Sequence, residues 1–134
     1  MDKLTPLQRS INMSKIKSEN TSPEVFVFRE LKNMGIKFKK HYKTHGKPDI
    51  AFPKQKIAVF INGEFWHGRN FKNYQNKLQE FWVKKISLNI LRDKNNYKKL
   101  KNEGWVIIKI WDKDLKKNPQ REIKKITKAL KINL

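Results

Sequence analysis

The amino-acid sequence contains no cysteine, which excludes disulfide bonds and every zinc or iron–sulfur site built on thiolate ligands. It also has few acidic residues, 12 Asp and Glu in 134 residues, and no apolar run close to the ~18 residues of a membrane-spanning helix. The first residues lack the pattern of a secretory signal peptide. We therefore expect a cytoplasmic protein with a single domain over residues 1–134, because this length suits one hydrophobic core.

Positive charge is what the sequence has in excess. Lys and Arg number 32, so the formal net charge at pH 7 is +20. A domain this basic needs a polyanionic partner to offset its self-repulsion, and the two candidates are nucleic acid and an anionic membrane surface. Aromatic residues make up 11% of the chain, and rings beside cations can stack on bases. Positive charge together with aromatic residues favours nucleic acid as the partner, and we expect no membrane partner.

Turn residues and hydrophobic periodicity divide the chain into helices and strands. A helix is expected over residues 21–35, where Thr21 and Glu24 have the spacing of a capping box and Gly35 is a natural end. Strands are expected at 36–39 and 49–52, buried strands at 57–61 and 105–111, a long helix at about 77–102 and a C-terminal helix within 116–134. Residues 1–20 form either a short helix or a basic arm. The order α–β–β–β–α–β–α predicts an α/β fold with a small mixed sheet flanked by helices.

The acid most suited to chemistry is Asp49, which opens a strand after Pro48. If residues 49–52 and 57–61 pair as a hairpin, Asp49 lies beside the end of the second strand, at Ile61. A carboxylate and a main-chain carbonyl placed in this way can hold Mg²⁺, which needs few protein ligands because it keeps several waters. The alternative is that the Pro-Asp pair only forms a turn.

Histidine and aromatic residues gather just after that hairpin. His67 lies in a glycine-flanked loop with Phe65 and Trp66, where it can serve as a general base or simply as a hydrogen-bonded loop residue. The loop is irregular, so we expect its two aromatic rings to be exposed. The other histidines, His41 and His45, have no such context and are expected to be solvated.

Several blocks occur together and in one order along the chain. They are Arg9-Ser10 with Asn12-Met13, Thr21-Ser22-Pro23-Glu24, Gly46-Lys47-Pro48-Asp49-Ile50, Phe60-Ile61-Asn62-Gly63-Glu64-Phe65-Trp66-His67-Gly68, Phe81-Trp82-Val83-Lys84-Lys85-Ile86, Asn89 with Arg92-Asp93, and Gly104-Trp105 with Ile110-Trp111. In this combination the sequence resembles the very short patch repair (Vsr) DNA mismatch endonucleases over roughly residues 5–115.

The resemblance implies a restriction-endonuclease-like fold and a Mg²⁺-dependent enzyme that nicks one strand of double-stranded DNA beside a T·G mismatch, the product of 5-methylcytosine deamination. We expect it to work as a monomer. The resemblance assigns Asp49 as the metal-binding acid and the main-chain carbonyl of Ile61 as the second ligand. His67 then helps to prepare the attacking water, while Glu24 and Asp93 hold metal-bound waters and orient the site.

The resemblance also assigns contacts with DNA. Phe65, Trp66 and Trp82 match aromatic residues that wedge into the duplex from the major groove, and Met13 and Ile16 match apolar residues of an N-terminal arm on the minor-groove side. Asn62 stands where the family often has a histidine; it can hydrogen-bond a phosphate but cannot shuttle protons. A mismatched pair unstacks more easily than a matched one, so wedging selects for a mismatch.

Some of these residues have a purely structural alternative. Trp105 and Trp111 lie on an expected buried strand, so we assign them to core packing. Trp82 suits either the core or a DNA contact, and Glu24 can be the acid of a capping box as well as a residue of the site.

Family members usually carry a structural zinc held by three cysteines and a histidine, and this chain has none of the four ligands. The matching positions are Glu64, Arg69, Phe71 and Lys113. We expect no zinc, and we hypothesise that Glu64, between two cations and packed beside Phe71, forms a salt-bridge staple instead. The alternatives for Glu64 are an additional metal ligand and a solvated loop acid.

Two other functions are compatible with the sequence. One is a related nickase or restriction-type nuclease with a different DNA target, and the other is a non-catalytic basic module that binds DNA or RNA. The non-catalytic module is disfavoured because four matching catalytic positions are kept among only 12 acids and three histidines: Asp49, His67, Glu24 and Asp93.

Overall fold

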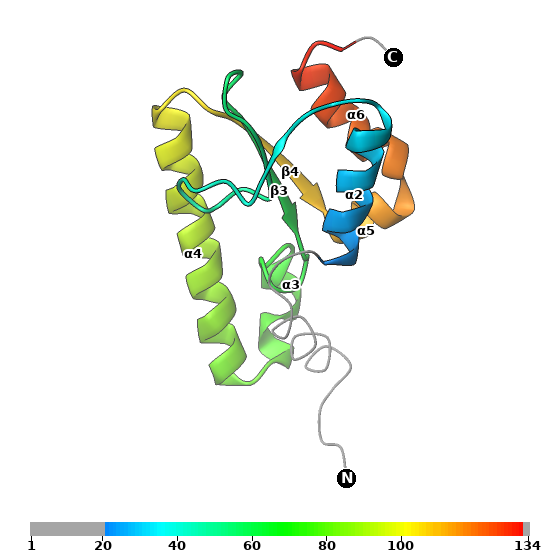
Figure 1. The fold of residues 1–134 in the computed structure, drawn as a ribbon. Helices are drawn as coiled ribbons and strands as arrows, with labels where there is room; N and C mark the ends of the chain where they lie inside the picture. Colours follow the sequence, from blue (N-terminus) through cyan, green and yellow to red (C-terminus); the bar gives the residue numbers. More distant parts are fainter. Residues whose placement is uncertain (1–20, 133–134) are drawn as a thin grey trace.

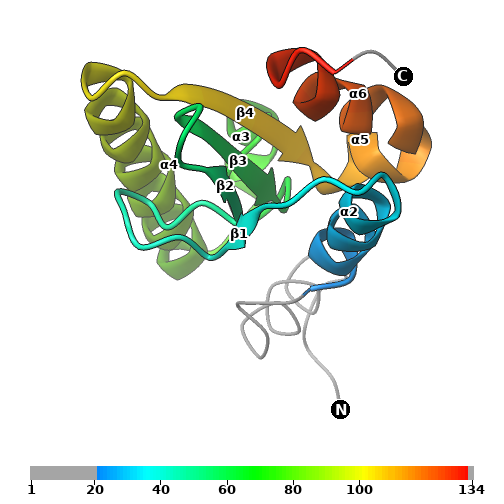
Figure 2. The ribbon, with the colours of Figure 1, turned by 45° about the horizontal axis from the view of Figure 1, so that its top comes forward.

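A mixed β-sheet with the strand order β1-β2-β3-β4 runs through the centre of the molecule (Figures 1 and 2). The computed structural model describes residues 21–132, so the N-terminal arm expected over residues 1–20, with Met13 and Ile16, lies outside the described part of the chain. The strands are β1 (Lys39–Lys40), β2 (Ile50–Phe52), β3 (Ile57–Asn62) and β4 (Val106–Trp111). The helices are α2 (Ser22–Asn33), α3 (Phe71–Tyr74), α4 (Glu80–Asn102), α5 (Asp112–Lys117) and α6 (Pro119–Ala129), with a 3-10 helix at Gln75–Lys77.

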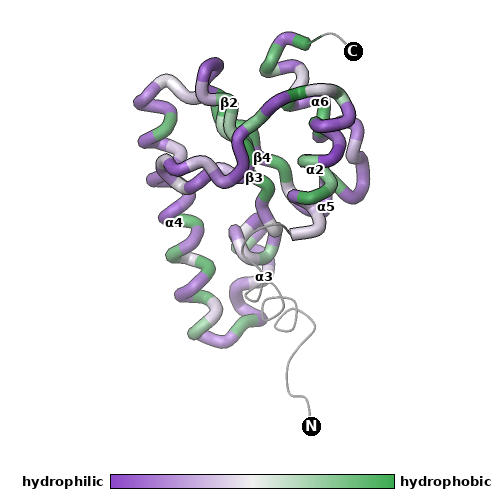
Figure 3. Tube along the Cα trace, viewed as in Figure 1, coloured by the Kyte–Doolittle hydropathy of each residue, from purple (hydrophilic) through white to green (hydrophobic). Residues whose placement is uncertain are grey.

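Strand β3 is buried over its whole length because helices cover both faces of the sheet (Figure 1). Its residues alternate between two cores: Ile57, Val59 and Ile61 pack with α2, α5 and α6, whereas Ala58 and Phe60 pack with α4. A strand buried on both faces has a continuous apolar sequence, as this one does. Figure 3 shows hydrophobic residues gathered in the central strands, while α4 is mainly hydrophilic with separate apolar positions.

The pairing of the strands confirms the predicted α/β architecture. β1, β2 and β3 pair antiparallel, and β3 pairs with β4 in parallel, with α4 as the crossover between them. The C-terminal helix is also confirmed: α6 begins at Pro119, and the Asn118 side chain accepts the N–H of Arg121 as a cap. Within residues 21–132, no helix has both the length and the apolar character to cross a lipid bilayer.

Other expected elements differ from the structure. In place of a strand at 36–39 there is only β1, because the N–H of Ile36 closes the end of α2 on the Leu31 carbonyl. β4 was expected to be buried, but it is an edge strand in which only Ile108 and Ile110 are buried. α5 follows β4 directly and was not predicted, since six residues carry too little periodicity to indicate a helix.

The loop after β3 packs directly on α4 through Gly68. This glycine has a φ of +72°, and a Cβ atom there would lie 2.3 Å from Ile90 Cδ1 and 3.1 Å from Ile86 Cγ2. The left-handed backbone and the close approach both require glycine. Because His67 directly precedes Gly68, this contact fixes how closely His67 lies against the helix.

Gly68→Ala should destabilise the protein more than the matched substitution Gly35→Ala. The two glycines have nearly the same φ, +72° and +73°, but a Cβ at Gly35 meets nothing within 4 Å. We expect Gly35→Ala to cost about 1 kcal/mol from backbone strain alone, and Gly68→Ala about 2–4 kcal/mol because strain and overpacking add. Urea unfolding measures both; equal losses in the free energy of unfolding would contradict the packing argument.

Candidate active site

Asp49 directly precedes β2, at the end of the sheet where β3 continues past β2. The pairing of β2 with β3 reaches its limit at Ile50 opposite Val59, so the N–H of Ile61 lies beyond the last paired residues. The Asp49 carboxylate binds this group: Oδ2 accepts a hydrogen bond from the Ile61 N–H at 2.6 Å. The hairpin therefore brings Asp49 beside Ile61, as the spacing in the sequence suggests.

The carbonyl of Ile61 points toward the same edge. In an extended strand the N–H and C=O of one residue face the same neighbour. The Lys56 carbonyl accepts the N–H of Val106, so the backbone groups of every second residue from Lys56 onward face β4. The residues between them, including Ile61, face β2. Ile61 therefore directs both backbone groups toward Asp49, and a carboxylate oxygen and a carbonyl oxygen converge there. These are ligand types that Mg²⁺ prefers.

Two further side chains reach Asp49 from other elements. Glu24, in the first turn of α2, is buried. His41, just after β1, has a side chain only 15% exposed, and its Nε2 lies 3.4 Å from Glu24 Oε2. One ligand atom from each of Glu24, His41 and Asp49 lies within 4.8 Å of the other two. The expectation that His41 is solvated is wrong, because its side chain is largely enclosed and lies against the buried Glu24.

The two carboxyl groups of this cluster are held close together away from solvent. The pKa of Asp49 is raised from 3.8 to about 8, mainly by burial; the hydrogen bond with Glu24 and the charge of Glu24 contribute to this rise, and the Ile61 N–H opposes it. The Thr21 side chain makes no capping hydrogen bond, so the capping box expected with Glu24 is not completed. Glu24 contributes instead to a cluster that a cation would stabilise.

His67 is positioned by Asp93 on α4, with 2.6 Å between His67 Nδ1 and Asp93 Oδ2. An ionised Asp93 accepts the Nδ1–H, which leaves the lone pair on Nε2. One turn earlier on the same helix face, Asn89 Nδ2 donates to the Trp66 carbonyl at 3.2 Å. α4 therefore holds the loop at three successive residues, Trp66, His67 and Gly68.

Tyr97, one turn beyond Asp93, connects the two halves of the site and was not identified from the sequence. Its hydroxyl accepts a hydrogen bond from Asn62 Nδ2 at 3.1 Å. Burial is the main cause that raises the pKa of Tyr97 to about 12, and the charges of Asp93 and Asp49 add to it. The sequence suggests a phosphate contact for Asn62, but the structure buries this residue and joins it to Tyr97. The spacing of Asp93 and Tyr97, four residues apart, was the available signal.

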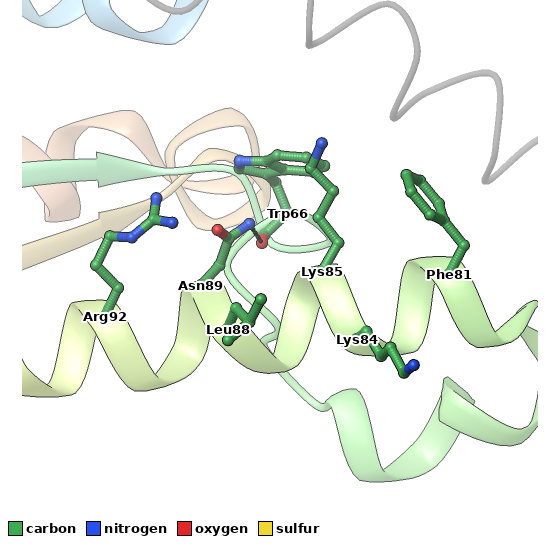
Figure 4. A pocket seen from close by; sticks show the side chains of 7 residues that line it. All are labelled: Trp66, Phe81, Lys84, Lys85, Leu88, Asn89 and Arg92. Atoms are coloured by element: carbon green, nitrogen blue, oxygen red, sulfur yellow. Dashed lines mark hydrogen bonds between the residues drawn. The ribbon is translucent and has the colours of Figure 1, made fainter.

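A groove lies between the loop and α4 (Figure 4). It has a volume of about 410 Å³ and is lined by Trp66 from the loop and by α4 residues that include Phe81, Lys84, Lys85, Leu88 and Arg92. The Lys85 ammonium lies 5.6 Å from the centroid of the Trp66 ring and 5.7 Å from that of Phe81, which is 58% exposed. Aromatic rings beside such cations suit stacking on bases with the cations near phosphates.

The expectation that both aromatic rings of the loop are exposed is wrong, because Trp66 and Phe65 are both half-buried. Phe65 is half-buried and stacks on Tyr74 with 5.2 Å between ring centroids, and the Tyr74 hydroxyl donates to the Phe65 carbonyl at 3.2 Å. Trp82 is buried and lies edge-on to the ring of Phe81, with 5.0 Å between centroids. Trp105 and Trp111 are half-buried rather than fully enclosed. Trp66 is therefore the resemblance-assigned aromatic residue that lines the groove.

Arg69 connects this loop to the segment after β4. Its Nη1 donates to Glu64 Oε1 at 3.0 Å and to Asp114 Oδ2 at 2.9 Å. The guanidinium lies 5.1 Å from the centroid of the Trp111 ring, and Lys113 Nζ lies 3.7 Å from Glu64 Oε2. Both contacts hypothesised for Glu64 are present, and Asp114 is a further partner that the sequence analysis missed.

A second acid of α5 holds the backbone of the same region. Asp112 Oδ1 accepts the N–H of Glu64 at 3.1 Å and the N–H of Lys113 at 2.8 Å. Phe71, expected beside Glu64, makes an edge contact with Tyr74 at 5.6 Å between centroids. Two acids within three residues after a strand are typical of a helix N-terminus, and this was the signal by which α5 could have been found.

Removal of the Asp49 charge should stabilise the metal-free protein at high pH. Because the pKa of Asp49 is higher in the folded than in the unfolded chain, its contribution to stability is present at about pH 4 and is lost as the pH rises to about 8. Asp49→Asn should therefore raise the Tm by about 5 °C at the upper pH and by little at the lower. Calorimetry in the presence of a chelator measures both. Glu103→Gln, at an exposed acid beside His45, is the matched control; an Asp49→Asn effect that does not change with pH would contradict the burial argument.

Glu64→Gln should lower the free energy of unfolding by about 1–3 kcal/mol, because it leaves Arg69 with one carboxylate in a half-buried site. Glu80→Gln is the matched control, since Glu80 faces Lys84 in an exposed pair on α4 and should change stability by less than about 0.5 kcal/mol. Chemical unfolding compares the two variants. If both lose equally little, Glu64 is a solvated loop acid and not part of a staple.

Comparison of the sequence with known proteins identifies relatives of this chain. The profile of the DNA mismatch endonuclease Vsr family matches residues 1–73. The chain is 41% identical to the type II nicking enzyme V.HpaIIP of Haemophilus parainfluenzae, over 97% of this chain and 96% of that protein. It is 38% identical to the type II nicking enzyme V.NmeDIP of Neisseria meningitidis serogroup C, over 98% and 91%, and 30% identical to the DNA mismatch endonuclease Vsr of Escherichia coli (strain K12), over 78% and 69%.

These matches confirm the resemblance inferred from the sequence blocks, and the mixed sheet flanked by helices agrees with the restriction-endonuclease-like fold expected from it. The relatives are named as endonucleases and nicking enzymes, so the non-catalytic module is set aside. The chain belongs to the DNA mismatch endonuclease Vsr family and is a DNA endonuclease.

Proposed function

We propose that this enzyme uses Mg²⁺ to nick one strand of double-stranded DNA beside a T·G mismatch, in the repair of deaminated 5-methylcytosine. One observation carries the proposal, a series of hydrogen bonds that relates the two groups. Asp49 binds the N–H of Ile61, and the next residue, Asn62, binds Tyr97. Tyr97 lies one turn of α4 from Asp93, which holds His67, so a candidate metal site and a base belong to one centre. The name of the Escherichia coli relative, a DNA mismatch endonuclease, supports the same activity.

The residues at the sheet edge fit a divalent cation. Asp49 and the Ile61 carbonyl would hold it directly, and Glu24 would act through bound waters. The fit rests on two carboxyl groups kept together in a buried space, where desolvation, with a smaller contribution from Glu24, raises the pKa of Asp49. When bound, a divalent cation offsets charge on the scissile phosphate and lowers the pKa of water in its shell.

His67 is suited to take up the proton of the attacking water. Asp93 keeps the Nδ1 proton in place, so Nε2 is the basic nitrogen, and the Asp93 charge then stabilises the imidazolium that forms. The water oxygen attacks phosphorus directly, and the departing 3′ oxygen takes up a proton from solvent. A covalent intermediate with the protein is not required.

We assign the selection of a mismatch to the groove between the loop and α4. Trp66 and Phe81 are positioned to wedge or stack at a weakened base step, and Lys85 between them offsets the phosphate charge there. The net charge of +20 adds affinity for any duplex but no sequence information. We propose that the enzyme binds as a monomer and acts in the bacterial cytoplasm.

A second candidate is a nickase with another DNA target. The relatives from Haemophilus and Neisseria are named type II nicking enzymes, without reference to a mismatch. Both candidates use the same centre and differ only in which duplex is recognised.

The deciding experiment is a nicking assay with Mg²⁺ on otherwise identical duplexes that are matched, carry T·G, or carry other mismatches. The first candidate predicts single-strand cleavage beside T·G, at least about tenfold faster than on the matched duplex, and loss of cleavage in Asp49→Ala. Equal cleavage of matched DNA supports the second candidate. Binding without cleavage, unaffected by Asp49→Ala, contradicts both.

Trp66→Ala tests recognition in the same assay. It should reduce the preference for T·G over matched DNA by about tenfold, because stacking is worth about 1–3 kcal/mol per base, and leave salt-sensitive binding to matched DNA in place. Leu91→Ala, at an exposed residue of α4 outside the groove lining, is the control. Equal losses on matched and mismatched duplexes would contradict the wedge role.

A further inference from the structure

His41 lies on the side of Asp49 away from Ile61. β1 pairs with β2 as far as Lys40 opposite Ile50, and one residue further the His41 N–H donates to the Asp49 carbonyl at 3.0 Å. Asp49 is therefore bound from both neighbouring strands, by its backbone toward His41 and by its side chain toward Ile61. The position of His41 beside this acid is consequently set by the ladder of the sheet.

The backbone at His41 turns its ring into the cluster. Its φ of +46° is in the left-handed region, which costs free energy for a residue with a side chain. The imidazole lies edge-on to the Phe28 ring, with 6.0 Å between centroids, and directs Nε2 toward Glu24. Packing on Phe28 and the ladder hydrogen bond together hold a nitrogen at a buried pair of carboxyl groups.

The distances suit one shared cation. The candidate ligand atoms of Glu24, His41 and Asp49 lie within 4.8 Å of one another, and two ligands on opposite sides of Mg²⁺ are about 4.2 Å apart because each bond is about 2.1 Å. The slightly wider spacing leaves room for Glu24 to act through a bound water while Asp49 and His41 approach the cation directly. Two carboxylates and a neutral imidazole around a divalent cation also balance in charge, which a buried site requires.

We propose that the imidazole of His41 binds the divalent cation directly, beside Asp49, so that this enzyme has a metal site with a nitrogen ligand. The inference rests on the metal dependence in the proposed function and goes beyond it by adding a ligand. Imidazole binds first-row transition ions more strongly than it binds Mg²⁺, which prefers oxygen ligands and water. The site should therefore favour Mn²⁺ over Mg²⁺ by more than a site with only oxygen ligands.

The test uses the untagged full chain and Mn²⁺ as the probe. Pulsed electron paramagnetic resonance of bound Mn²⁺ should show coupling to a ¹⁴N nucleus in the wild-type protein, and that coupling should change to the ¹⁵N pattern when histidine is labelled. Because the chain has three histidines, variants assign the signal. His41→Gln should remove it, while His45→Gln, at a residue paired with Glu103, should retain it.

Affinities give a second readout. A Mn²⁺ titration followed by electron paramagnetic resonance, with Mg²⁺ as competitor, should show that His41→Gln weakens Mn²⁺ binding by about tenfold and changes Mg²⁺ binding by much less, since glutamine offers an oxygen in place of the nitrogen. Melting curves confirm that the variant is folded. The labelled wild-type spectrum does not depend on any variant.

The outcomes separate this inference from the proposed function. Mn²⁺ bound in the wild type and lost in Asp49→Ala, without histidine coupling, would overturn the role of His41 and leave the metal site intact; His41 would then only pair with Glu24. Coupling that disappears in His67→Gln but persists in His41→Gln would overturn it as well. Absence of Mn²⁺ and Mg²⁺ binding in the wild type, or full binding in Asp49→Ala, would overturn both proposals.

Discussion

Two carboxyl groups, on Glu24 and Asp49, are held together in a space that little solvent reaches, and the rest of the site is arranged around that constraint. Neither can move away, because α2 fixes the first and hydrogen bonds from two neighbouring strands fix the second. Burial, and to a smaller extent the neighbouring Glu24, opposes ionisation of Asp49, and this is kept in the folded protein at a cost to stability. Such a cost is common where a protein prepares a binding site in advance, since the ligand then finds its groups already oriented.

The helix α4 fixes the position of the His67 loop relative to the end of β3 beside Asp49. Ile90 meets the loop backbone at Gly68, Asp93 holds His67, and Tyr97 reaches Asn62 at the end of β3. These contacts come from one straight face of one helix, so the loop cannot shift along it without breaking several at once. Across from α4, Arg69 joins Glu64 of the loop to Asp114 of α5; Glu64 and Arg69 stand at two of the positions that the resemblance matches to zinc ligands. A guanidinium shared by two carboxylates has less cross-linking strength than a metal but keeps a defined geometry.

The sequence was most informative where a short-range pattern decides the structure. The hairpin around residues 53–56 and the cap at Asn118 depend on local turn chemistry, and both were predictable. The position of His41 beside Asp49 was not, because it depends on the pairing register of β1 with β2, and that register cannot be read from either short strand alone. The contact of Asn62 with Tyr97 was missed for a similar reason: an amide at a strand end gives no sign of whether a tyrosine of a distant helix will pack against it.

The ends of the sheet have a consequence of their own. One outer strand, β1, is only two residues long and consists of exposed lysines. The other, β4, carries Lys109 at its centre, and the carbonyl of Lys109 is already occupied by the ammonium of Lys125 from α6. Neither border offers the long, flat, uncharged row of backbone groups on which strands from separate molecules stack. Positive charge thus has a second effect besides attracting polyanions, because it discourages fibrillar aggregation through the open borders of the sheet.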